Sequence, residues 1–160
     1  MIIRLCLAVA LVVTASPAAA AGLNEQTVRR FLAAQEAAWN ARRLDVYFAG
    51  FTPDATFVDQ HVTPKETITY GRSTVSQAKA AAKRFLAGAK SNERSTIRSI
   101  WISKDRSKGR VLGWEVTTVV TGGRTRRVCA NTEQVLIYTG SKILSRGQTD
   151  SIVNCPAGLR

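Results

Sequence analysis

The sequence predicts a single α+β domain, and three observations support this fold class. Apolar residues recur at the spacing of an amphipathic helix between residues 24 and 40. An alanine-rich helical segment covers residues 73–87. After residue 95 the composition changes to Val, Ile, Thr and Trp, in runs separated by turn residues, which is typical of consecutive antiparallel strands. Helices followed by such a meander form an α+β pattern.

The first 21 residues have the layout of a secretory signal peptide. A single positive charge precedes an apolar run over residues 5–13, and Pro17 and four alanines follow. The run is shorter than the roughly 20 residues that cross a bilayer, so a retained anchor is the weaker alternative. We expect cleavage after Ala20 or Ala21, no stable membrane insertion afterwards, and a periplasmic or secreted protein with one domain over residues 22–160.

Basic residues outnumber acidic ones. The chain has 23 Lys and Arg against 11 Asp and Glu, a formal net charge of +12. Such an excess favours anionic partners but also simply keeps a protein soluble, and both interpretations stay open. Since the protein is expected to be exported, we expect no nucleic-acid partner. Many basic side chains fall in two turns at opposite ends of the predicted strands: Lys104, Arg106, Lys108 and Arg110 in one, Arg124, Arg126 and Arg127 in the other.

Helical signals define the first part of the domain. Asn24 is placed to cap the first helix, and Glu25 complements the positive end of its dipole. The apolar stripe of this helix contains one amide, Gln35, which needs a hydrogen-bond partner or a wet cavity beside it. A short second helix is predicted over residues 44–51, ended by Pro53.

Side-chain alternation predicts the strands. In the first strand, residues 55–61, Phe57, Asp59 and His61 fall on one face. A short β-rich segment follows at residues 67–70. The four later strands are expected near residues 95–103, 110–120, 125–138 and 143–153, with turns at 105–109, 122–123 and 139–142.

Two cysteines, Cys129 and Cys155, lie beyond the leader. In an oxidising compartment they are expected to form a disulfide. If Thr139 lies opposite Lys142 in the last hairpin, Cys129 faces Ile152, and the bridge then needs a bulge or a tail that curls back. Two thiols and the single histidine do not form a metal-ligand pattern, so no metal and no cofactor is expected.

Three stretches of the chain resemble the cone-shaped family of nuclear transport factor 2-like proteins, which includes SnoaL-like polyketide cyclases and ketosteroid isomerase. The resemblance implies an α+β, cystatin-like fold with three helices packed on a curved, mainly antiparallel sheet around a conical cavity. It also implies that the outer face of the sheet can form a homodimer. The matching stretches are residues 39–59, which include Trp39-Asn40-Ala41 and Phe51 to Asp59, then Tyr70-Gly71-Arg72, and Gly140 to Ile143.

The resemblance places Asp59 at the position of the general base of ketosteroid isomerase. A carboxylate in an apolar cone would have a raised pKa, which suits proton transfer, and His61 on the same face could share the proton. The alternative is an Asp that caps a turn. The tyrosine position of that isomerase falls on Gln35, and its protonated acid falls on Glu133 or Gln134. These departures argue against ketosteroid isomerisation itself.

Three functions therefore stay open. The leading hypothesis is binding of a small, largely apolar molecule in the cone; the others are an acid–base enzyme of the isomerase, cyclase or hydratase type, and a non-catalytic dimerisation or accessory module. The chain has no phosphate-binding loop and no nucleophile elbow, so nucleotide hydrolysis and serine-hydrolase chemistry are not expected. The residues expected to line the cavity are Gln35, Phe57, Tyr70, Trp114, Gln134, Tyr138 and Asp150.

Overall fold

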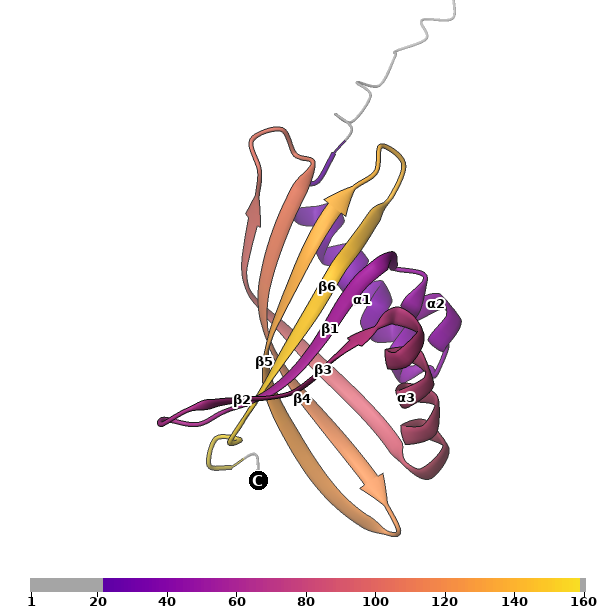
Figure 1. Cartoon of the computed structure of the whole chain (residues 1–160), viewed down its shortest axis with the longest axis vertical. Helices are drawn as coiled ribbons and strands as arrows, with labels where there is room; N and C mark the ends of the chain where they lie inside the picture. Colours follow the sequence, from indigo (N-terminus) through magenta and orange to yellow (C-terminus); the bar gives the residue numbers. More distant parts are fainter. Residues whose placement is uncertain (1–21, 159–160) are drawn as a thin grey trace, which may run out of the picture.

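Three helices lie on one side of a strongly curved six-stranded sheet in the computed structural model, which describes residues 22–158 (Figure 1). The sheet order is β2-β1-β6-β5-β4-β3. The β1–β6 pair is parallel and every other pair is antiparallel. The elements are α1 (Glu25–Asn40), α2 (Leu44–Phe48), β1 (Phe51–Val62), β2 (Thr67–Thr74), α3 (Val75–Gly88), β3 (Lys90–Ile102), β4 (Lys108–Thr121), β5 (Arg124–Tyr138) and β6 (Ile143–Val153).

The predicted signal peptide, residues 1–21, lies outside the described residues. None of the helices within residues 22–158 combines the length and the hydropathy that a membrane-crossing segment requires.

Helix α1 begins where the sequence predicts, because its first turn is capped from both sides. The Thr27 backbone N–H donates to Asn24 Oδ1 at 2.8 Å, and the Asn24 N–H donates to Thr27 Oγ1 at 3.0 Å. This reciprocal pair satisfies amide groups that have no partner within the helix. Leu23 and Val28 beside the cap are both fully buried, so the start of the helix is held by packing as well.

Helix α2 is shorter than predicted. It ends at Phe48, because Phe51 already belongs to β1, where it pairs with Ser145 of β6. The Ser145 N–H also donates to the Gly50 carbonyl at 2.8 Å, which fixes the chain in the sheet before Pro53 is reached. Tertiary pairing therefore overrides the local helical pattern.

Two apolar clusters hold the helices against the sheet. The first packs α2, the start of β1 and α3 together and consists of Ala38, Tyr47, Phe48, Phe51, Ala55 and Ala82. The second lies at the N-terminal end of α1 and consists of Leu23, Val28, Val111 and Leu136. Burial of these side chains is the main favourable term for the fold.

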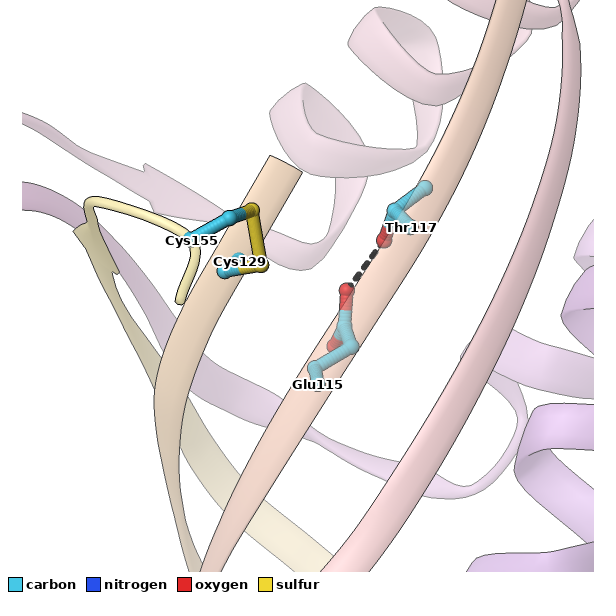
Figure 2. Close-up of a disulfide and its surroundings, with 4 residues drawn as sticks. All are labelled: Glu115, Thr117, Cys129 and Cys155. Carbon is cyan, nitrogen blue, oxygen red and sulfur yellow. Dashed lines mark hydrogen bonds between the residues drawn. A yellow bond between two sulfur atoms is a disulfide. The ribbon is translucent and has the colours of Figure 1, made fainter. Parts of the chain in front are cut away.

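The disulfide between Cys129 and Cys155 is confirmed (Figure 2). A bulge at Val135/Leu136 shifts the β5–β6 register so that Cys129 lies opposite Val153. The segment after β6 then brings Cys155 back to a Cα–Cα distance of 5.2 Å. The sequence analysis gave a bulge and a returning tail as alternatives that would allow this bridge, and both are present.

Candidate functional site

Helix α1 and the inner face of the sheet enclose a cavity of about 350 Å³. Leu32, Ile97 and Val111 form an apolar part of its wall. The remaining wall is polar, and its amide, carboxyl and phenol side chains come from six different elements: Gln35 and Glu36 of α1, Tyr47 of α2, Glu93 of β3, Glu115 of β4, Gln134 of β5 and Gln148 of β6. The cavity therefore has an apolar side and a polar side.

The strand register brings the acidic side chains onto the same face. Asp150 of β6 lies between Asp59 of β1 and Thr132 of β5. Glu115 of β4 lies opposite Ala130 of β5 and Ser95 of β3. Because side chains two residues apart in a strand share a face, Glu93 lies on this face beside Ser95. These carboxyls form a cluster across the inner face, which we call the carboxyl cluster: Asp59, Glu93, Glu115 and Asp150.

Gln148 connects this cluster to the helices. Its Nε2 donates to both carboxyl oxygens of Asp150, at 3.0 and 2.9 Å. Its Oε1 accepts from the Tyr47 hydroxyl at 3.2 Å and from Gln134 Nε2 at 2.8 Å. Asp150 is thus held in place by a chain of hydrogen bonds that starts in α2, while Gln134 Oε1 has no partner in the described residues.

Burial dominates the electrostatics of the carboxyl cluster. It raises the pKa of Glu93 to about 9, with further contributions from the charges of Glu115 and Asp150. Burial and the charge of Glu115 raise the pKa of Asp150 to about 8. Burial also raises the pKa of Glu115, against the opposing hydrogen bond that its carboxylate accepts from Thr117 Oγ1 at 2.6 Å (Figure 2). Glu93 and Asp150 therefore keep their protons near neutral pH.

Gln35 lies on the cavity wall with its amide unsatisfied. The residue is only 6 % exposed, and neither Oε1 nor Nε2 has a hydrogen-bond partner in the described part of the chain. Gly50 makes room for it, because a Cβ at that position would come within 2.8 Å of Gln35 Nε2. A buried amide without partners carries a free-energy penalty, which a polar ligand atom would remove.

Asp59 and His61, the predicted catalytic pair, are placed differently from one another. Asp59 is exposed and lies opposite Asp150, and partial burial raises the pKa of its carboxyl. A bulge at Asp59/Gln60 then carries the β1–β2 hairpin away from the helices (Figure 1). The His61 ring stacks on Tyr70 within this hairpin, with 6.5 Å between centroids. Neither His61 nor Tyr70 lines the cavity.

Trp114 lies on the outer face of the sheet, so the expectation that it lines the cavity is wrong. Gln134 and Val111 face each other on the inner face, and Trp114, three residues beyond Val111, points the other way. Its ring packs under the Arg98 guanidinium, 5.0 Å from the ring centroid. The sequence shows which side chains share a face but not which of the two rows faces the helices.

Phe57 and Tyr138 lie on the inner face but belong to the packing around the cavity and do not line it. Phe57 contacts Phe51 and Phe48 in the first apolar cluster, with ring centroids 4.6 and 5.7 Å apart. Tyr138 packs against the second cluster, and its hydroxyl donates to the Gly140 carbonyl at 2.8 Å.

The sequence analysis missed five members of the polar wall, namely Glu36, Tyr47, Glu93, Glu115 and Gln148. A charged residue at 115 within the apolar run from Trp114 to Val120 is a signal that could have indicated an inward carboxyl. Gln148 lies two residues before Asp150 and so shares its face. In residues 22–158 no three His, Cys, Asp or Glu side chains are arranged to hold a metal ion.

Comparison with known proteins identifies the fold of the chain but not a family. No family model matches the chain, and no curated protein matches it in sequence. A conserved protein from Planctomyces limnophilus DSM 3776 matches with a TM-score of 0.69 and 14 % identity, over 81 % of this chain and 95 % of that one. A ketosteroid isomerase-like protein from Erwinia carotovora atroseptica SCRI1043 matches with a TM-score of 0.62 and 11 % identity, over 83 % and 100 %.

The beta subunit of benzoate 1,2-dioxygenase from Burkholderia mallei ATCC 23344 matches with a TM-score of 0.65 and 11 % identity, over 81 % of this chain and 91 % of that one. Identities this low indicate shared architecture and say nothing of shared chemistry. The chain therefore has the cone-shaped α+β fold of the nuclear transport factor 2-like superfamily.

Proposed function

We propose that this protein is an exported small-molecule-binding protein that holds its ligand in the cavity between α1 and the sheet. The observation that carries the proposal is Gln35, a buried amide on the cavity wall that has no partner for either polar atom. The cavity volume of about 350 Å³ lies in the range of small-molecule sites, roughly 300–1,000 Å³. The leader-like composition of residues 1–21 supports export to the periplasm or the medium.

The polar end of the ligand is assigned to Gln35, Glu93 and Glu115, and its apolar body to the wall formed by Leu32, Ile97 and Val111. This assignment modifies the hypothesis in which Asp59 and His61 alone form the polar end, because the β1–β2 hairpin carries His61 away from the cavity. Asp59 remains adjacent to the site through its position opposite Asp150.

Native mass spectrometry of the purified protein, before and after denaturation, tests this proposal. The wild type should carry a small molecule, or take one up from a fragment library, and Gln35→Leu should lose it because leucine supplies no hydrogen bond. Gln26→Leu, at an exposed position of the same helix, is the matched control and should keep it. If no molecule binds, or if binding survives Gln35→Leu unchanged, the cavity is not the site.

A second candidate function is acid–base catalysis at the same place. Asp59 and Asp150 lie opposite one another on neighbouring strands, and the pKa of Asp150, raised to about 8, suits a proton donor next to a base. Once a bound molecule is known, its conversion can be followed by mass spectrometry. An enzyme should lose turnover but retain binding with Asp59→Asn, whereas a binding protein should show no turnover in either form.

The expected homodimer would use the outer face of the sheet. Trp101, Leu112 and Val135 lie there and are 58 %, 37 % and 42 % exposed. Trp101 and Val135 both lie opposite Arg110, so the three strands β3, β4 and β5 contribute to one surface. Sedimentation velocity should give a dimer for the wild type and a monomer for Trp101→Arg.

A further inference from the structure

We infer that the molecule bound in the cavity is a small organic cation, an amine carried on an apolar body. This inference rests on the proposed binding function and names its ligand class. It follows from how charge is distributed between the inside and the outside of the domain, and from which hydrogen-bonding atoms in the cavity lack partners.

The first observation is that the carboxyl cluster has no cation of its own. The protein is strongly basic, at +12, yet each of the four salt bridges in the described residues uses an acidic residue outside the cluster: Glu25, Asp45, Asp54 and Glu133. The basic side chain on the cavity wall is Arg29, and its guanidinium is bound to Glu25, at 2.9 Å from Nε and 2.7 Å from Nη2. Glu93 and Glu115 are the members of the cluster that line the cavity, whereas Asp59 and Asp150, the latter expected on the wall, lie beyond it. The two glutamates thus face a cavity without a free basic side chain among the described residues.

The second observation concerns hydrogen-bond acceptors. Gln35 and Gln134 both line the cavity, and Oε1 of each lacks a donor in the described residues. The unpartnered amide atoms of these two wall residues are thus two acceptors and one donor, Gln35 Nε2. An ammonium group has three N–H donors and no acceptor, so it complements this set. The free Nε2 would donate a hydrogen bond to a hydroxyl or carbonyl oxygen on the same molecule.

Other ligand classes fit less well. An anion would enter a cavity lined by Glu36, Glu93 and Glu115, where the basic lining residue, Arg29, is already bound to Glu25 and no free cation would balance its charge. A metal ion would need three ligating side chains in a suitable arrangement, and residues 22–158 contain no such group. The apolar wall of Leu32, Ile97 and Val111 instead favours a cation with a hydrocarbon body.

Binding of a cation must be linked to loss of protons from the cluster. The charged and titratable groups that face the cavity or adjoin it come from six elements: Arg29 and Glu36 from α1, Tyr47 from α2, Asp59 and Asp150 from β1 and β6, and Glu93 and Glu115 from β3 and β4. Glu93 and Asp150 hold protons near neutrality, and a cation beside them would favour their ionised forms. The affinity for an amine should therefore rise between pH 6 and pH 8.

The experiment compares benzylamine with benzyl alcohol, which has nearly the same shape and no charge. Isothermal titration calorimetry of the wild type at pH 8 should give an affinity for the amine about tenfold higher or more. Titrations in two buffers of different ionisation enthalpy should show proton release for the amine only. The double variant Glu93→Gln and Glu115→Gln should lower the affinity for benzylamine to that for benzyl alcohol. The control Glu66→Gln, at an exposed position of the β1–β2 hairpin, should leave the affinity for benzylamine unchanged.

The outcomes separate the ligand class from the binding function. If benzyl alcohol binds as tightly as benzylamine, or if the amine binds without proton release, the organic-cation inference is wrong and the cavity site stands. If benzylamine binds and the double variant, shown to be folded by circular dichroism, binds it equally well, the inference is also wrong. If neither probe nor any library member binds, the proposed function itself fails.

Discussion

The charged side chains on the two faces of the sheet differ in whether they have partners of opposite charge. On the outer face Glu133 is paired with Arg110, whose Nε and Nη2 donate at 2.7 and 2.8 Å, and Arg98 covers Trp114. On the inner face Asp59, Glu93, Glu115 and Asp150 have no basic partner in the described residues. Exposed pairs contribute little to stability, whereas unpaired buried carboxyls oppose folding when they ionise. Ionisation of the inner carboxyls therefore opposes folding, whereas the charges of the outer face have little effect on it.

The largest expected effect comes from the disulfide that links β5 to the segment after β6. Replacing Cys129 and Cys155 together by alanine should lower the free energy of unfolding by about 3 kcal/mol, because the crosslink restricts the unfolded chain. Thermal unfolding with and without reductant measures this. The wild type in reductant should match the double variant, and a variant as stable as the oxidised wild type would contradict the expectation.

The pH dependence of the free energy of unfolding tests the contribution of the inner carboxyls. Because the pKa values of Asp150 and Glu93 are raised to about 8 and about 9, the folded protein keeps these protons to a higher pH than the unfolded chain. Their contribution to stability is complete below about pH 4 and is lost as the pH rises through 8 and 9. Urea unfolding should show a loss on the order of 2 kcal/mol between pH 5 and pH 9. A flat profile over this interval would contradict the assignment.

Removing the charge of Asp150 should remove part of this dependence of the free energy of unfolding on pH. Asp150→Asn should raise the free energy of unfolding at pH 9 by on the order of 1 kcal/mol and change it little at pH 5, where the carboxyl is protonated in the folded state. Urea unfolding at both pH values tests this against Glu66→Gln, which should behave as the wild type at each. Equal effects of Asp150→Asn at the two pH values would mean that the residue acts through packing.

The smallest effect is expected on the outer face. Glu133→Gln removes the charge that pairs with Arg110, but this pair is exposed to solvent and screened by salt. The melting temperature should not change beyond the error of the measurement at pH 7. A clear destabilisation would show that the outer face depends on its ion pairs and would weaken the contrast between the faces.

The sequence is sufficient for the fold class because its signals are local. The cap at Asn24, the strand at residues 143–153 and the need for a bulge or a returning tail in the Cys129–Cys155 bridge can all be deduced from nearby residues. The site depends on which face of each strand meets the helices, and alternation alone cannot determine that, as Trp114 shows. The carboxyl cluster is assembled by pairing between strands far apart in the chain, so no local pattern predicts that its four side chains share one site.

The place of β6 in the sheet has a consequence for biosynthesis. It is the last strand in the chain, yet it lies between β1 and β5 and joins the hairpin of β1 and β2 to the meander of β3, β4 and β5. Until residues 143–153 have left the ribosome, the two parts of the sheet have no shared strand. Contacts this distant in sequence form slowly. In a nascent chain of this topology the two parts of the sheet therefore stay unpaired until β6 has emerged.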